Sequence, residues 1–512
     1  MSTQRLFPSP LRKTLITVSV MGTTLVVALD ATIAVVAIPH MQASLNASPE
    51  QVTWVLTSYL IASAIMMPLA SWLASKFGRK RLIVISITTF TIASMACGLA
   101  RSLEFMVFAR LLQGAAGAGL IPLGQATLLD INPPEKQPSA MAIVGLGAML
   151  GPLLGPTIGG WLTDNYTWRW VFLINLPIGL AAIAGAIFSH IEVKDKDLPK
   201  FDMFGFLALT GFIGAFQLLM DRGQQNDWFD SPETYVEAGL LAFSFYLLLV
   251  HMLTRKDTFV RAALFADRNF ALGTIISTVI GILIFASSPI LTLMTQNLLG
   301  YSPLKNGLVS LPRGIGTIIS LLVVTRTINR IDPRILLSIG LSLSVFSLYL
   351  YSQLSLETDE GPILFAGLFQ GFSGGMLISP LSALAFSTLS PKFRNEGAAI
   401  FALSRNIGNS LGISAIQVMS IQASAQVASR LAEGIRPDNP MLQLVRPDFD
   451  FTSQNTLART SGEIWRQAMM VSTIDTFWLG CIVGLATLPV ILLMKRTRLG
   501  QAAAAPPVDT GH

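Results

Sequence analysis

Three polar residues inside long apolar stretches are the ones whose chemistry stands out in this sequence. Asp30 lies in the stretch that begins near residue 14, and Arg110 and Gln113 lie in another that begins near residue 104. A charged side chain surrounded by hydrocarbon is costly, and such residues commonly mark ion or substrate pathways. Asp30 is the candidate proton carrier, Arg110 its candidate partner, and Gln113 is placed one turn away to orient the arginine. A structural charge pair is the alternative interpretation.

Asp30 and Arg110 are expected at similar depths. The first stretch ends near Pro39, about nine residues after Asp30, and the second begins near Glu104, about six residues before Arg110. With a rise of 1.5 Å per residue, both charges lie roughly 9–14 Å from the same boundary. An arginine beside a carboxylate favours its charged form, while desolvation opposes it, so a proton and a cationic substrate would compete there.

A second set of polar residues lies in the later part of the chain. It contains two cations and two amides, which are Arg313, Arg405, Asn406 and Asn409. This region has no obvious buried acid to pair with the arginines. We therefore expect either a role in a binding cavity, through anionic groups, backbone carbonyls or lipid headgroups, or structural pairing.

Glycines recur every four residues after residue 146, and prolines follow two of them. The set is Gly147, Gly151, Pro152, Gly155, Pro156, Gly159 and Gly160. Residues four apart share one helical face, and small residues there allow another helix to approach closely. The pattern predicts either simple close packing or a bent seam against the other half of the molecule.

Composition places this chain in a membrane. Of its 512 residues 52% are hydrophobic and 12% charged, whereas soluble domains average about 25% charged. The net charge of +6 does not indicate a nucleic-acid partner, because the basic residues fall in short loops between apolar runs. No metal-spaced cluster, phosphate-binding loop or nucleophile–base set is present, so we expect no cofactor, metal or enzymatic activity.

Hydropathy predicts about fourteen membrane spans. They are expected at 14–37, 52–75, 82–100, 104–129, 138–162, 169–190, 202–220, 235–254, 270–295, 304–328, 335–352, 362–386, 396–420 and 471–494. The predicted organisation is a tail at 1–13, a six-helix bundle at 14–190, a two-helix insertion at 202–254, a second bundle at 270–494 and a tail at 495–512. Loop charges place both termini in the cytoplasm.

An internal repeat supports this division. Residues 108–121 match residues 365–378 without a gap, and the same offset pairs Gly151 with Gly408 and Gly155 with Gly412. Two parallel six-helix repeats are typical of one class of secondary transporter.

Three motifs resemble those of the major facilitator superfamily. Arg110-x-x-Gln113-Gly114 resembles its motif B, the glycine and proline series from Gly151 to Gly160 resembles its motif C, the antiporter motif, and Gly78-Arg79-Lys80 resembles its motif A. Ser75 stands where motif A usually has an aspartate. The resemblance is closest to the fourteen-span drug:proton antiporters of the EmrB/QacA type.

This resemblance implies an all-α membrane fold of two six-helix bundles plus two inserted helices, with Asp30 and Arg110 lining a central cavity. It also implies proton-driven multidrug efflux of lipophilic compounds, cations among them, across the inner membrane by alternating access. A periplasmic adaptor and an outer-membrane channel would be the partners. Two alternatives stay open: an exporter of one metabolite, such as a siderophore, lipid or amino-acid derivative, or a membrane sensor or scaffold without flux.

The longest polar segment, 421–470, separates the last two spans and is expected outside the membrane. Helical spacing up to Ala432 and prolines at Pro437 and Pro440 divide it into two arms. It is either an ordinary external loop or a docking surface for a partner.

Overall fold

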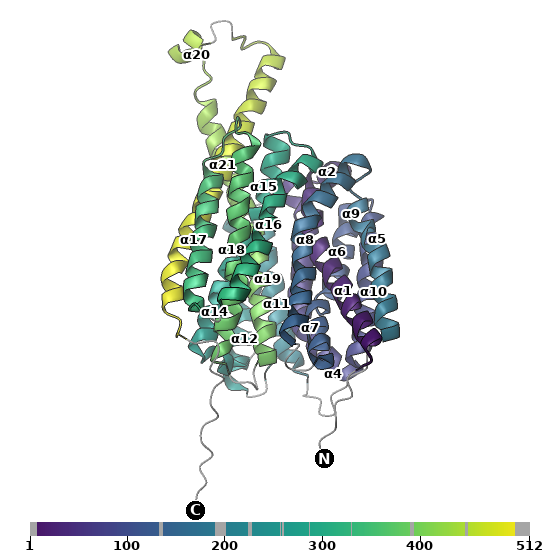
Figure 1. Cartoon of the computed structure of the whole chain (residues 1–512). Helices are drawn as coiled ribbons and strands as arrows, with labels where there is room; N and C mark the ends of the chain where they lie inside the picture. Colours follow the sequence, from purple (N-terminus) through teal and green to yellow (C-terminus); the bar gives the residue numbers. More distant parts are fainter. Residues whose placement is uncertain are drawn as a thin grey trace, which may run out of the picture.

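The chain folds into two helical bundles that lie side by side (Figure 1). The computed structural model describes residues 8–132, 137–189, 201–223, 228–255, 258, 261–285, 287–328, 330–389, 394–445 and 449–496. Within these ranges no strand occurs and a helix lies at every predicted span. Eleven of the described helices or helix runs are long and apolar enough to cross a membrane. The predicted all-helical fold is therefore confirmed.

The N-terminal bundle carries the first group of candidate residues. Its helices are α1 (Pro10–Val36), α2 (Ile38–Ser44), α3 (Pro49–Val52), α4 (Trp54–Phe77), α5 (Arg79–Gly98), α6 (Leu103–Gly117), α7 (Leu120–Ile131), α8 (Gln137–Asn165), α9 (Trp170–Leu173) and α10 (Asn175–Ser189). The predicted fourth span is broken between α6 and α7. Pro122 has no N–H to bond the carbonyl of Ala118, which explains the break.

The insertion forms a hairpin of α11 (Met203–Arg222) and α12 (Pro232–Thr254), with a short turn of helix η2 (Trp228–Asp230) between them. At its open end, His251 Nε2 lies 2.8 Å from Asp202 Oδ2. Gln217 in α11 donates a 2.7 Å hydrogen bond to Ser414. The hairpin is thus tied to the second bundle through a polar contact in an otherwise apolar interface.

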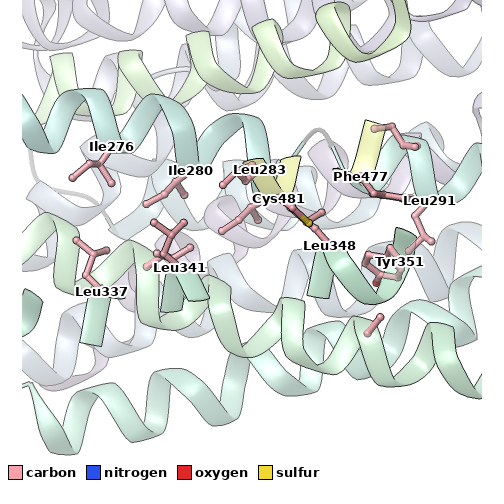
Figure 2. Packing of buried hydrophobic residues seen from close by; sticks show 14 of the residues in the cluster. Ile276, Ile280, Leu283, Leu291, Leu337, Leu341, Leu348, Tyr351, Phe477 and Cys481 are labelled. Carbon is pink, nitrogen blue, oxygen red and sulfur yellow. The ribbon is translucent and has the colours of Figure 1, made fainter. Parts of the chain in front are cut away.

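The C-terminal bundle repeats the arrangement of the first. Its elements are α13 (Ala262–Phe265), α14 (Arg268–Ile280), the π-helical turns η3 (Gly281–Phe285) and η4 (Met294–Leu298) on either side of α15 (Ser287–Leu293), α16 (Pro303–Thr327), α17 (Pro333–Ser352), α18 (Glu360–Ser387), α19 (Arg394–Ala432), α20 (Pro440–Val445) and α21 (Gln454–Leu492). Figure 2 shows its core, in which Ile276, Ile280 and Leu283 face Leu337, Leu341 and Leu348. Single π turns interrupt the regular hydrogen bonding of a helix and are frequent at functional sites.

The predicted external segment 421–470 is mostly helix. α19 runs on to Ala432 without a break, since residues 415–432 contain neither glycine nor proline, and α21 already begins at Gln454. Figure 1 shows the two helices projecting beyond the bundles, at the end opposite both termini, with α20 at the tip. The segment is therefore a helical extension of two spans rather than a loop laid over the bundle.

Candidate functional site

Asp30 is the centre of a fully buried polar cluster in the N-terminal bundle. Its Oδ2 atom lies 2.6 Å from Arg110 Nη1, and its Oδ1 atom accepts hydrogen bonds of 2.8 Å from both Gln113 Nε2 and Asn175 Nδ2. Asp30 is 0% exposed and Arg110 is 1% exposed. The structure therefore brings together the three residues predicted for this site and adds a fourth.

The local sequence explains why α6 presents this pair of side chains. Arg110 and Gln113 are three residues apart and so lie on the same helical face. Arg110 Nη1 also donates to Gln113 Oε1 at 2.9 Å, which fixes the amide with its nitrogen toward Asp30. Ser102 caps the helix by accepting from the backbone N–H of Phe105, so the register of the face is set from its first turn.

The guanidinium of Arg110 is held on its other sides as well. Its Nε donates to the carbonyl of Val55 at 2.8 Å, and its Cζ lies 4.3 Å from the centre of the Tyr59 ring. Tyr59 is 5% exposed and supports the arginine. A cation over an aromatic face is stabilised most when both are desolvated.

Asn175 and Ser94 belong to the cluster and were not predicted. Asn175 Nδ2 donates to Ser94 Oγ at 3.0 Å as well as to Asp30, and Ser94 donates to the carbonyl of Phe172 at 2.9 Å. Both side chains are 0% exposed. Their polar character inside predicted spans was the available indication, but amides and hydroxyls there are common.

This arrangement encloses the Asp30 carboxylate within the protein. Arg110, Gln113 and Asn175 donate to its two oxygens, and Asp30 is 0% exposed. In this conformation a cationic cargo would have to displace Arg110 to reach the carboxylate. Adding a proton to Asp30 would instead remove its charge and leave Arg110 without a counter-ion.

The polar residues of the second bundle do not join this cluster. Arg313 Nη2 donates to the carbonyl of Ile284 at 2.7 Å. The backbone of Arg405 packs on Gly281, and Asn406 lines a small pocket between α4, α11 and α19. Asn409 is 6% exposed. These four residues surround η3 and the neighbouring part of α19 rather than a single cavity.

The sequence pattern of the Major Facilitator Superfamily matches residues 20–413. The chain belongs to this superfamily. Multidrug export protein EmrB of Escherichia coli (strain K12) is 30% identical over 487 residues, which cover 94% of this chain and 95% of that protein. Fatty acid resistance protein FarB of Neisseria gonorrhoeae is 32% identical and covers 91% of this chain and 93% of its own length. The chain is thus an EmrB-type member of the superfamily.

A solved structure supports the same fold. The crystal structure of a bacterial homologue of the human lysosomal transporter Spinster, in an inward-facing and unoccupied conformation, has a TM-score of 0.61 and 17% identity, and covers 95% of this chain and 98% of that one. Together with the family match and the relatives above, the fold identifies a multi-pass membrane transporter and not an enzyme.

The glycine series of this major facilitator protein packs against its own bundle, which corrects the expected seam against the other half. A Cβ atom added at Gly151 would lie 2.6 Å from Ala28 Cβ, and one at Gly159 would lie 2.7 Å from Ile33 Cγ1. Gly155 meets Thr32, whose Oγ1 donates to the carbonyl of Gly151 at 3.0 Å. Each of the four glycines Gly147, Gly151, Gly155 and Gly159 thus has a residue of α1 against it, so this face of α8 meets α1.

Gly160, one position further along α8, lies on a face that meets the second bundle together with Pro156 and Thr157. A Cβ at Gly160 would collide with the carbonyl of Pro303, and one at Gly307 with the carbonyl of Pro156. Thr157 Oγ1 donates to the carbonyl of Gly307 at 3.3 Å. Since neighbouring helical residues point about 100° apart, the series presents one face to α1 and a different one to α16.

The candidate gate loop is short and tied at both sides. Gly78 has φ 94°, a left-handed value that a glycine adopts without strain, so α4 can turn directly into α5. Arg79 pairs with Asp130 at the end of α7, and Lys80 Nζ donates to the carbonyl of Ile187 at 2.6 Å. Asp130 was not predicted. It supplies a carboxylate near this loop, where Ser75 replaces the usual aspartate of motif A.

Proposed function

We propose that this transporter exports lipophilic compounds across the cytoplasmic membrane in exchange for protons, with Asp30 as the residue that carries the proton. The observation that supports this is the completely buried cluster of Asp30, Arg110, Gln113 and Asn175. A carboxylate in such a place is stable only while all of its donors hold it. Its protonation state and the packing of three helices are therefore linked.

The coupling runs from Asp30 to the contact between the bundles through α1. Two residues after Asp30 on α1, Thr32 donates to the carbonyl of Gly151 in α8. The carbonyl of Val36, at the end of the same helix, accepts a 3.0 Å bond from Gln296 in the second bundle. Releasing Asp30 from α6 and α10 would free α1 to move against both neighbours, and thereby the two bundles against each other.

The names of the relatives support lipophilic cargo, since one concerns multidrug export and the other fatty acid resistance. Export of a single metabolite is the competing function, and a cargo series differing in headgroup and chain length separates the two. Cargo-dependent movement of protons, if observed, would exclude a sensor or scaffold that transports nothing.

We further infer that both termini are cytoplasmic and that the helical extension above α19 and α21 stands in the periplasm, where it docks an adaptor that leads to an outer-membrane channel. Four large apolar side chains of the extension are at least 41% exposed, which are Leu431, Leu444, Leu457 and Trp465. An amphipathic helical arm is a recurring way to bind another helix.

Cargo-driven proton release in proteoliposomes tests the coupling. Proteoliposomes that contain the wild-type protein and a pH-sensitive dye should report proton release when ethidium is added. Asp30→Asn should abolish this release, because the amide cannot exchange a proton, and the release is compared per amount of folded protein, since the variant leaves Arg110 without its counter-ion. Asp164→Asn, at an exposed carboxylate near the end of α8, is the matched control and should behave as wild type. Wild-type exchange by Asp30→Asn would refute the assignment.

A further inference from the structure

A pair of hydrogen-bonded polar residues in the first bundle has a counterpart at the equivalent positions of the second bundle. Gln113 donates to Asp30 across 83 positions of sequence, and Gln370 donates to Ser287 Oγ at 2.6 Å across the same separation. The two glutamines occupy equivalent places in the internal repeat, and so do the two acceptors. In the second bundle a hydroxyl therefore stands where the first has its carboxylate.

The arginine of this second site comes from a different helix. A Cβ at Gly114 would collide with the carbonyl of Tyr59, and a Cβ at its repeat partner Gly371 would collide with the carbonyl of Arg313. Arg313 on α16 thus occupies the position of Tyr59 on α4. Gly367 occupies the position of Arg110, and a Cβ placed there would lie 3.9 Å from Arg313 Cβ and 3.4 Å from Tyr351 Oη.

Arg313 and Ser287 converge on one backbone oxygen. Arg313 Nη2 donates to the carbonyl of Ile284 at 2.7 Å, and Ser287 Oγ donates to the same carbonyl at 2.9 Å. Ile284 lies in the π turn η3, directly before α15. The positive charge is held in place by this carbonyl, but a carbonyl does not neutralise it.

Two polar groups at this site are left for an anion. Among the described residues no carboxylate forms an ion pair with Arg313, and the side chain is partly exposed. The hydroxyl of Tyr351, a residue 1% exposed, has no hydrogen-bond partner in the same part of the chain. Figure 2 shows Tyr351 beside Leu348 and Phe477 in the apolar core, so its hydroxyl is the polar end of an otherwise apolar wall. An uncompensated cation and an unused donor favour an acidic ligand group.

We propose that Arg313 and Tyr351 form a binding site for the carboxylate of a lipophilic acid, placed where the repeat of Asp30 lacks its own carboxylate. Arg313 is ten residues from Pro303, the first residue of α16, which is about 15 Å of helix and places it far from the headgroups of the bilayer. The ligand is thus an acid that enters the bundle, not a lipid bound at the surface. This rests on the proposed export of lipophilic compounds and adds the class of headgroup.

Binding of a fluorescent acid and its uncharged twin tests this site directly. The probes are 11-(dansylamino)undecanoic acid and its primary amide, titrated onto the full-length protein in nanodiscs, with empty nanodiscs as blank. Wild type should bind the acid about 10-fold or more tightly than the amide, as expected for a charge-assisted pair in a poorly solvated site. Arg313→Gln should remove this preference and leave the affinity for the amide unchanged.

Two further variants keep the result independent of folding. Ser287→Asp supplies the missing carboxylate beside Arg313 and should also abolish the preference for the acid, although the arginine is intact. Arg326→Gln, at an exposed arginine on the same helix that bonds only a carbonyl of its own turn, should retain the full preference. Equal binding of acid and amide by wild type, or an unchanged preference in Arg313→Gln, would overturn the proposal.

The outcome can be separated from that of the proposed export. Ethidium-driven proton release in proteoliposomes reports coupling without using an acidic cargo. If the wild-type protein prefers the acid but releases no protons, the binding site is supported and the proposed export function is refuted. If it releases protons but binds acid and amide equally, the export function is supported and the binding site is refuted.

Discussion

Asp30 and Arg110 meet at a point where neither side chain reaches solvent. Taking two ions out of water costs several kcal/mol each, and their attraction offsets this only when the other lone pairs and N–H groups are also bonded. Gln113 and Asn175 meet this condition at the carboxylate, and the Val55 carbonyl meets it at the guanidinium. The stability of the cluster therefore depends on both charges being present together.

This gives a prediction for single and double variants. Arg110→Gln leaves Asp30 buried without its counter-ion and should lower the free energy of unfolding by about 3–5 kcal/mol. Asp30→Asn together with Arg110→Gln removes both charges and should recover most of that loss, without restoring proton exchange. Thermal denaturation of the purified protein measures the difference. Equal destabilisation by the single and the double variant would show that the ion pair contributes nothing specific.

Part of this site could be read from the sequence. Asp30, Arg110 and Gln113 stood out because ionised and amide groups are rare within long apolar runs. Asn175 did not, since it lies near the start of a predicted span, where an amide is ordinary. The absence of an acid near Arg313 was visible in the sequence, but the approach of Tyr351 was not, because it depends on how α17 and α16 both pack against α18.

At the scale of elements, α8 shows what a periodic pattern leaves open. The recurrence of glycine every four residues predicted a close helix–helix contact, and the contact exists. Which helix would be the neighbour depended on the tertiary arrangement: the face of Gly147, Gly151, Gly155 and Gly159 meets α1, and the face of Gly160 meets α16 of the second bundle. Two adjacent glycines, Gly159 and Gly160, have different partners, which no periodicity of one helix could specify.

Gly155→Leu should therefore act on the N-terminal bundle alone. The new side chain would be forced against Thr32 in α1, and overpacking of this kind costs about 1–3 kcal/mol or more. We expect a lower melting temperature and a lower yield of folded protein in detergent. Gly214→Leu, on α11 where a Cβ would meet nothing within 4 Å, is the matched control. A wild-type melting temperature for Gly155→Leu would contradict the packing described.

At the scale of the whole molecule, the two bundles touch at the end opposite the termini. Gly160 and Gly307 lie against facing backbones there, and Gln296 bonds the end of α1. Backbone-to-backbone contacts of this kind exist only while both glycines lack a side chain. The arrangement is thus sensitive to one methyl group at either position.

Gly160→Val should separate the bundles at this end. Its side chain would collide with the carbonyl of Pro303, so the population should shift toward a conformation in which α8 and α16 are apart. Spin labels at the exposed positions Tyr166 and Ser302 would report this as a longer distance in pulsed electron resonance. Gly22→Val, at a glycine with open space around it, should leave the distance unchanged, and an unchanged distance in Gly160→Val would mean that the contact is not a gate.

The helical extension leads to the last prediction, because it stands clear of both bundles (Figure 1). Its apolar side chains contribute little to the core, and Leu444 at the tip is 77% exposed. Replacing residues 433–453 by a glycine–serine linker of equal length removes α20 while α19 and α21 keep their full length. If the extension docks an adaptor, intact cells should lose resistance while the purified protein still exchanges cargo for protons. Leu444→Asp should do the same through one side chain, and Leu444→Met, which stays apolar, should not. Unchanged cellular resistance in the linker variant would exclude docking here, whereas joint loss of resistance and purified activity would assign the extension to the stability of the transporter itself.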